Sequence, residues 1–190
     1  MRYDRMVVAY HGCDAGVAER LLGGASLEPS QNAYDWLGEG IYFWEYGEDR
    51  ALQFAQEQVE RGRVRTPAYV GALIQLGDCF DLLDTRFTSE LAAAYVPWME
   101  SQPPEKLPLP RNAGPAPDYK LRYRDRAVLD WYLEFLEQEE GRRYDTVRCG
   151  FLEGEPVFPG SGILKQTHIQ LTVRNPSCIV GVFRPNVERS

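Results

Sequence analysis

The sequence lacks the patterns that mark membrane-spanning, secreted and zinc-binding proteins. It has no apolar run of the length that crosses a bilayer. Its opening stretch, MRYDRMVVAYHG, has no apolar core of the kind found in a signal peptide. Its four cysteines form no CxxC or CxxH pair, which argues against a zinc site and for reduced thiols. We therefore expect a cytoplasmic protein with no metal ion and no membrane contact.

The common nucleotide-binding and hydrolase motifs are also missing. A Walker A sequence is absent, and neither GxG, at 38–40 or 160–162, lies between a strand and a helix as a Rossmann fold requires. No GxSxG is present, which disfavours a serine hydrolase. Cys13 lies two residues from His11, but this spacing does not ensure contact between a nucleophile and its base. Neither kind of nucleophilic catalysis is favoured.

Acidic residues outnumber basic residues: the sequence has 28 Asp and Glu and 21 Lys and Arg, which gives a net charge of -7. This balance argues against a broad surface for binding phosphates. Two basic stretches, ERGRVR at 60–65 and KLRYRDR at 120–126, are local exceptions that can also be ordinary solvated faces. The length of 190 residues suits one domain, 1–190, with the proline-rich segment 102–117 as a loop within it.

Hydrophobic patterning alternates between strand and helix along most of the chain. Short apolar or alternating runs predict strands, and apolar residues at helical spacing predict helices. Strands are predicted at 6–12, 40–45, 68–84, 144–151, 168–173 and 178–183, and helices at 15–24, 47–62 and 123–140. This order favours an α+β fold with a split, partly antiparallel sheet over a Rossmann fold.

Several residues in the first third of the chain are candidates for binding a flat ligand. His11 ends the first strand and precedes Gly12, where the missing side chain leaves room beside the backbone. Tyr42 follows the two glycines of GEGIYF, and Phe54 lies one helical stretch later; both rings can stack on another ring. From the local sequence alone, a histidine at a strand end and two core aromatic residues explain the same pattern at least as well.

A strand near the C-terminus carries the remaining candidates. In THIQLTV the alternation places His168, Gln170 and Thr172 on one face and the apolar residues on the other. The polar face is either an exposed sheet surface or the floor of a cleft. Glu153 and Glu155, in LEGEPVF, are the acids nearest to this strand in sequence.

Taken together, YHG at 10–12, LGEGIYFWEYGEDRALQFA at 37–55 and THIQLTV at 167–173 resemble the ADP-ribosyltransferase superfamily. The resemblance is to the diphtheria-toxin and poly(ADP-ribose)-polymerase-like branch with its His-Tyr-Glu motif, and to bacterial members with Gln in the third position. It covers both ends of the chain and leaves about 87–143 unaligned. It implies an α+β fold in which two antiparallel sheets form an NAD cleft, with flanking helices.

The resemblance also implies roles for individual residues. His11 would bind the adenine-side ribose of NAD, and the backbone of Gly12 would hold the nicotinamide carboxamide. Tyr42 would pack against the nicotinamide ring, Phe54 would offer a second stacking face, and Gln170 would take the third, catalytic position. The glycines Gly38 and Gly40 would shape the turn beside the cofactor, Tyr34 would line the outer cleft, and Trp36, Phe43 and Trp44 would be core residues.

Two positions depart from the family pattern. Ala51 stands where many polymerases have a hydroxyl residue, which removes one contact to the amide. Gln170 stands where the family has a glutamate, whose carboxylate stabilises the cationic ribose left when nicotinamide departs. We therefore expect slower bond cleavage, or help from Glu153 or Glu155, and transfer of single ADP-ribose units. His168 would act as a base on the acceptor nucleophile. A surface histidine on a strand is an equally good interpretation of this residue.

The resemblance thus implies an NAD-dependent mono-ADP-ribosyltransferase of the kind found among bacterial toxins and effectors. NAD would be its substrate, an unidentified protein, nucleic acid or small molecule its acceptor, and a neutralising antitoxin protein a possible partner. An NAD glycohydrolase and a catalytically silent module that binds NAD or ADP-ribose are alternatives. A further alternative is an interaction protein whose proline-rich loop docks on a partner.

Overall fold

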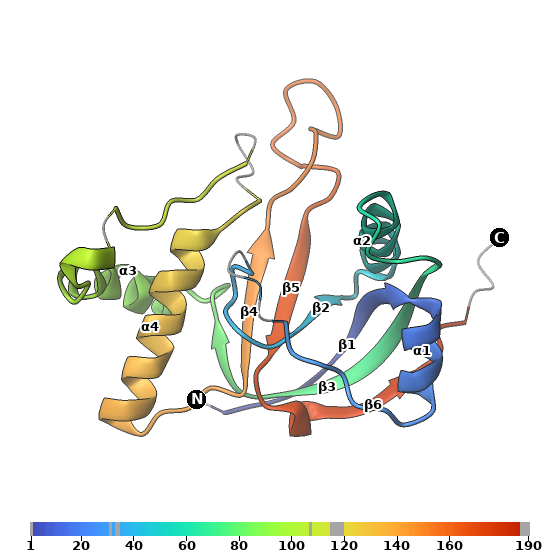
Figure 1. Cartoon of the computed structure of the whole chain (residues 1–190), viewed down its shortest axis with the longest axis horizontal. Helices are drawn as coiled ribbons and strands as arrows, with labels where there is room; N and C mark the ends of the chain where they lie inside the picture. The colour runs from blue at the N-terminus through green and yellow to red at the C-terminus, as the bar shows by residue number, and fades with distance from the viewer. Residues whose placement is uncertain (1, 31, 33–34, 107, 115–119, 187–190) are drawn as a thin grey trace.

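The computed structural model describes residues 2–30, 32, 35–106, 108–114 and 120–186. In this part of the chain, six strands and four α-helices form a mixed α+β fold (Figure 1). The strands are β1 (Arg2–Asp14), β2 (Ile41–Glu45), β3 (Pro67–Asp81), β4 (Thr146–Phe151), β5 (His168–Val173) and β6 (Ile179–Phe183). The helices are α1 (Ala15–Leu22), α2 (Glu48–Glu60), α3 (Thr85–Glu100) and α4 (Tyr123–Glu140), with short 3-10 turns at Pro104–Lys106 and Pro176–Cys178.

All six strands belong to one hydrogen-bonded sheet in the order β1-β2-β5-β4-β3-β6. Because β1 pairs with both β2 and β3, the pairings run from β1 through β2, β5, β4 and β3 and return to β1. The β3–β4 pairing is parallel and the others are antiparallel. The predicted α+β class is confirmed, and the strands that were expected in two antiparallel sheets are hydrogen-bonded into one mixed sheet. The long β3 joins them, since most of it pairs with β1 while residues 79–81 pair with β4.

One face of this sheet holds an apolar core together with a buried ion cluster. Arg148 pairs in register with Leu171 of that core, so both side chains point to the same face. There Arg148 donates to Glu45 through Nε at 2.5 Å and to Asp81 through Nη1 at 2.9 Å. All three charged side chains are buried. The cluster therefore ties β2, β3 and β4 together inside the fold.

Helices cover the outside of the sheet on two sides. Figure 1 shows α3 and α4 on one side, α2 on the other, and the β4–β5 hairpin between them. A second apolar cluster, which includes Phe80, Phe87 and Leu133, joins α3 and α4 to the end of β3. None of the helices in the described ranges combines the length and the apolarity needed to cross a bilayer.

The segment 102–117 is largely irregular where the structure describes it, as the sequence predicts, and its residues 107 and 115–117 lie outside the described part. One of its side chains caps a helix. Asn112 Oδ1 accepts hydrogen bonds from the backbone nitrogens of Arg124 at 2.9 Å and Asp125 at 3.3 Å. These are first-turn nitrogens of α4, which no helix carbonyl can satisfy. The segment therefore anchors the start of α4 beside the sheet.

Candidate functional site

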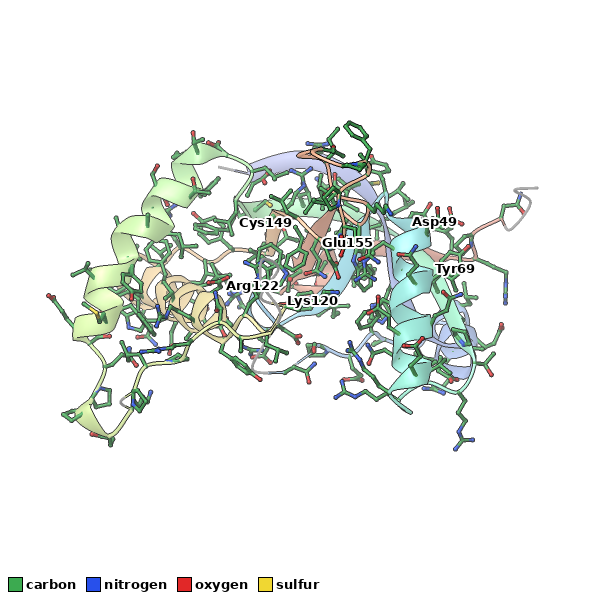
Figure 2. All side chains as sticks on the ribbon, turned by 90° about the horizontal axis from the view of Figure 1, so that it is seen from above. Asp49, Tyr69, Lys120, Arg122, Cys149 and Glu155 are labelled. Carbon is green, nitrogen blue, oxygen red and sulfur yellow. The ribbon has the colours of Figure 1, made fainter. Side chains whose placement is uncertain are left out.

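One cavity brings together most of the residues that the sequence singles out. It has a volume of about 430 Å³ and is lined by residues of β1, β2, α2, β4 and β5, and of irregular segments that include the one before α4. Its lining includes His11, Gly12, Tyr42, Phe54 and Gln170, together with His168 and Glu153. Figure 2 shows Lys120, another lining residue, between α2 and the pair formed by α3 and α4.

The floor of the cavity follows from strand alternation. Trp44 on β2 pairs in register with Gln170 on β5, so the two side chains point to the same face. His168 lies two residues before Gln170 and therefore shares that face. Phe43 and Leu171, the chain neighbours of Trp44 and Gln170, pair with each other and are fully buried on the opposite face. His168 and Gln170 of this polar face thus lie on the floor of a cleft, one of the two alternatives that the sequence leaves open, whereas Thr172 is buried and does not line it.

His11 is held in one tautomer by the neighbouring strand. Its Nδ1 lies 2.8 Å from the backbone oxygen of Tyr42, and because a carbonyl oxygen only accepts, this nitrogen carries the proton. Burial lowers the pKa of His11, against a smaller opposing effect of the same hydrogen bond, so the ring is neutral near pH 7. Its Nε2 is then a hydrogen-bond acceptor, suited to a hydroxyl group of a ligand.

Tyr42 offers its ring to the cavity and its hydroxyl group to the protein. The hydroxyl donates to the backbone oxygen of Gly38 at 2.8 Å and accepts from the backbone nitrogen of Leu37 at 3.0 Å. Burial raises the pKa of Tyr42 far above its usual range, so the phenol stays protonated. Phe54 on α2 supplies a second ring, which packs against Trp44 with ring centroids 4.9 Å apart. The cavity thus has aromatic surfaces from both β2 and α2.

Gln170 is oriented by Trp36. The Trp36 Nε1–H donates to Gln170 Oε1, and because an indole nitrogen only donates, this contact fixes which end of the amide is the oxygen. The NH2 end of the amide is therefore the part left for a ligand. Phe43 lies in the core as predicted, and Trp44 is also buried, 4% exposed, although it lines the cavity as well. Trp36, which was expected to be a core residue, is partly buried against the second apolar cluster and also lines the cavity.

Two glycines are required by packing within the protein. A Cβ atom at Gly12 would lie 2.1 Å from the backbone oxygen of Ala51, so the bare backbone is what lets α2 sit on β1. Gly40 has a φ of 151°, and a Cβ there would lie 2.6 Å from the backbone oxygen of Val173 on β5. Gly40 is absent from the cavity lining, in contrast to its expected place beside the cofactor. Gly12 lines the cavity and also allows α2 to pack closely on β1.

Glu153 is a buried carboxylate in the wall of the cavity, 2% exposed. Arg50 on α2 donates to its two oxygens at 3.1 and 3.2 Å, and Lys120 pairs with it from the segment before α4. Burial alone would raise the pKa of Glu153, but the contacts with Lys120 and Arg50 outweigh that effect and hold the pKa below its ordinary value. Glu153 is therefore ionised and balanced by two cations.

Two of the predicted site residues are not part of this arrangement. Glu155 is exposed on the connection between β4 and β5 and is not a cavity residue (Figure 2). Tyr34, which was expected at the outer cleft, lies outside the described residues. Within the described ranges, no group of three or more His, Cys, Asp or Glu side chains gathers as a metal site would require.

Sequence reasoning missed three residues that make contacts in the cavity, namely Trp36, Arg50 and Lys120. Trp36 reaches Gln170 across 134 positions of the chain, and Arg50 reaches Glu153 across 103. A single sequence carries no signal for such contacts. Arg50 lies within the stretch GEDRALQFA, in which the sequence analysis singled out Phe54 and not Arg50.

Comparison with known proteins does not assign a family to this chain. No protein-family model matches it, and no solved structure matches it significantly. A segment of 45 residues is 47% identical to the uncharacterized protein MJ0359 of Methanocaldococcus jannaschii. The match covers 24% of this chain and 21% of that protein, so the chain is matched to about a fifth of the relative's length.

Proposed function

We propose that this chain is an NAD-dependent mono-ADP-ribosyltransferase of the His-Tyr-Glu type with Gln170 in place of the glutamate. The observation that carries the proposal is the shared cavity of His11, Tyr42, Phe54 and Gln170, which come from β1, β2, α2 and β5. These residues carry the sequence resemblance, and nothing in their local sequence requires them to meet. A cleft with an acceptor imidazole and two aromatic surfaces suits a ligand that has both a ribose and a pyridine ring.

In this proposal the cavity is the NAD cleft of an ADP-ribosyltransferase-like fold. The nicotinamide ring packs against Tyr42, with Phe54 as the second aromatic surface. The backbone of Gly12 holds the carboxamide, and His11 Nε2 accepts a hydrogen bond from a hydroxyl group of the adenine-side ribose. Arg50 and Lys120 line the charged wall of the same cavity.

The reaction breaks the bond between nicotinamide and its ribose. Nicotinamide leaves as a neutral molecule with the bonding electron pair, and the ribose develops positive charge. A carboxylate beside that charge would speed the step, whereas Gln170 has its oxygen engaged by Trp36. The ionised Glu153 is already paired with Arg50 and Lys120. Both observations support slow cleavage, and the expectation of single ADP-ribose units follows from the glutamine at position 170.

The hydrogen bond between Trp36 and Gln170 also favours a second candidate function, a module that binds NAD or ADP-ribose without cleaving it. An amide NH2 can donate to a ribose hydroxyl oxygen, so it supports binding even where it does not stabilise a cation. An NAD glycohydrolase would use the same cavity with water as the acceptor and would differ only in its product.

The proposed biological role rests on the family resemblance alone. It is that of a bacterial toxin or effector that acts on NAD in the cytoplasm and is neutralised by an antitoxin protein. The acceptor is a protein, a nucleic acid or a small molecule.

The test incubates the protein with NAD labelled in its adenylate half and with a cell extract. Protein, nucleic acid and small-molecule fractions are then separated and counted. We expect label in one macromolecular fraction or in a small-molecule adduct, and its loss in His11→Ala. Glu155→Gln is the control, because this exposed carboxylate lies outside the cavity.

Three results separate the candidates. Free ADP-ribose as the only labelled product would identify a glycohydrolase. Binding of NAD without any nicotinamide release would identify the silent module. Label that persists unchanged in His11→Ala would contradict the proposed site.

A further inference from the structure

One face of α2 lines a long stretch of the cavity. The lining residues of this helix, together with the residue that caps its C-terminal end, recur at helical spacing and so share one face: Arg50, Phe54, Glu57, Gln58 and Arg61. About 16 Å of helix separates Arg50 from Arg61. The cavity therefore has two ends along α2, and the charged residues at these ends are in different states.

At the Arg50 end of this face, the positive charges are already matched within the protein. Arg50 pairs with Glu153 at 3.1 Å and with Glu57 at 3.4 Å. Lys120 pairs with Glu153 as well. Because two cations and two carboxylates balance one another here, this end offers little uncompensated charge to an anionic ligand.

The other end of the same face carries arginines that are open to solvent. Arg61 and Arg63, at and just beyond the end of α2, both line the cavity and are exposed. Within the described ranges, the side chain of Arg61 has no hydrogen bond and no ion pair. Glu28 and Asp35 also line the cavity, and neither of them pairs with Arg61. The charge of Arg61 is therefore available to a ligand, although acidic residues outnumber basic ones in the chain as a whole.

Two arginines at the mouth of a cavity suit a phosphate group. The planar guanidinium donates several N–H groups in the geometry that phosphate oxygens accept, and its charge complements theirs. In the proposed function the nicotinamide ring lies between Tyr42 and Phe54, and about 10 Å of helix separates Phe54 from Arg61. A single ribose lies between the pyridine ring and the diphosphate of NAD, and a long arginine side chain can reach across the remaining distance.

We propose that Arg61 and Arg63 form the subsite for the diphosphate of the ligand. This inference rests on the proposed function, because it assigns the part of NAD that His11, Tyr42 and Gln170 leave without a partner. The basic stretch ERGRVR at 60–65 would then contribute to ligand binding and would not be only a solvated face. The subsite binds and orients the ligand, and no bond is made or broken at it.

A third arginine of the same segment provides a matched control. Arg65 is also exposed but does not line the cavity, so Arg65→Gln removes the same charge outside the proposed subsite. Wild type, Arg61→Gln, Arg63→Gln and Arg65→Gln are each titrated calorimetrically with ADP-ribose, which carries the diphosphate but no pyridine ring. We expect Arg61→Gln and Arg63→Gln to bind ADP-ribose about five- to tenfold more weakly than wild type, and Arg65→Gln to stay within about twofold.

The dependence of binding on salt provides a second readout. The affinity of wild type for ADP-ribose should fall as the NaCl concentration is raised, because salt screens the attraction between exposed charges. The fall should be smaller in Arg61→Gln and the same as wild type in Arg65→Gln. If Arg61 acted only on the structure, its substitution would leave the salt dependence unchanged.

Failure of the subsite and failure of the transferase function give different results. Equal affinities in wild type and both cavity variants, equal losses in all three variants, or no binding of ADP-ribose to wild type would overturn the diphosphate subsite. Nicotinamide release from NAD by wild type would in those cases leave the transferase function in place. Weaker ADP-ribose binding in the two cavity variants, with no nicotinamide release by wild type, would overturn the transferase function and support the subsite.

Discussion

Gln170 and His168 share one face of β5, but their side chains have different partners. The oxygen of Gln170 is occupied by the indole of Trp36, whereas Nε2 of His168 has no partner among the described residues. At the position where a cation would form in the proposed reaction, the cavity therefore offers an amide, and two residues away lies an imidazole nitrogen without a partner among the described residues. The two residues are accordingly expected to respond differently to substitution.

Replacement of Gln170 by glutamate should increase NAD cleavage. One carboxylate oxygen can still accept from Trp36, and the other would face the ribose and stabilise its positive charge. A single well-placed electrostatic group changes kcat on the order of 10²-fold, so we expect an increase of about that size in nicotinamide release. Gln170→Ala is the control and should not show the increase. A glutamate variant no faster than wild type would show that this position does not face the reacting ribose.

Gly12→Ala should destabilise the fold, because the added Cβ would meet the backbone oxygen of Ala51 at 2.1 Å. Forced overpacking of this kind costs about 1–3 kcal/mol of the free energy of unfolding. Urea denaturation of the variant measures the loss. Gly181→Ala is the matched control, since a Cβ there has no neighbour within 4 Å and should change the stability by less than about 0.5 kcal/mol. Equal midpoints for the two variants would contradict the packing argument.

The sequence predicts which residue types gather in the cavity better than it predicts their partners. Alternation in THIQLTV places Gln170 and His168 on one face, and the structure makes that face a cavity floor. The two acids of LEGEPVF cannot be ranked from sequence, because only the fold brings Arg50 and Lys120 to Glu153 and leaves Glu155 exposed. Trp36 looked like a core residue for the same reason: its contact with Gln170 depends on the tertiary structure.

At the scale of elements, the buried cluster of Arg148, Glu45 and Asp81 holds three strands together on the face opposite the cavity. Trp44 and Glu45 are neighbours on β2, so the cluster also fixes the strand that carries part of the cavity floor. Removing this cation would leave the buried Asp81 without its ion pair and Glu45 with the longer contact to Arg5, at 3.8 Å.

Arg148→Met should lower the free energy of unfolding by about 3–5 kcal/mol, which is the usual loss when one partner of a buried ion pair is removed. Chemical denaturation measures it. The control is Arg184→Met, which removes an equally short but exposed pair with Glu19 and should cost less than about 1 kcal/mol. Similar losses in the two variants would show that the buried cluster contributes no more than a surface pair.

The element that the sequence failed to predict is α3. The sequence feature that marks this helix is its N-cap residue. Asp84 accepts a hydrogen bond from the backbone nitrogen of Arg86 at 2.9 Å. Along the helix, Pro97 interrupts the usual pattern, and its buried residues are few and widely spaced, namely Phe87, Ala94 and Trp98. The other three helices carry clearer apolar periodicity or glycine stops, and their predicted bounds lie within a few residues of those observed.

At the scale of the whole molecule, two buried neutral histidines make stability depend on pH. Burial lowers the pKa of both His11 and His168 below the ordinary value of 6.5. Below pH 6.5 the unfolded chain takes up protons that the folded chain does not, so stability falls with falling pH in this window. At pH values well above 6.5 the two histidines make no such contribution.

Urea midpoints measured at pH 7.5, 6.5 and 5.5 should therefore decrease in that order. The window lies above the range where Glu153 contributes, because its pKa is held below 4.5 and its stabilising effect is lost only at more acidic pH. In His168→Gln the decrease should be smaller, since one of the two linked groups is gone. A midpoint that is constant or higher at pH 5.5 would contradict the buried neutral state of these histidines.

The sequence was sufficient for the α+β class and for the strands and helices at both ends, because strong periodicity and glycine stops mark them. It was not sufficient for the way the sheet closes. That depends on the length of β3, whose residues pair with β1, β4 and β6 along different parts of the strand. Pairing partners of one long strand are set by the whole chain and leave no local pattern.

The most direct test of the central claim is a calorimetric titration of NAD into wild type, His11→Ala and Glu155→Gln. We expect one NAD per chain for wild type and Glu155→Gln, and an affinity at least about tenfold weaker for His11→Ala because one hydrogen bond to the ribose is lost. Absence of NAD binding to wild type, or equal affinity in wild type and His11→Ala, would contradict the assignment of this cavity to NAD.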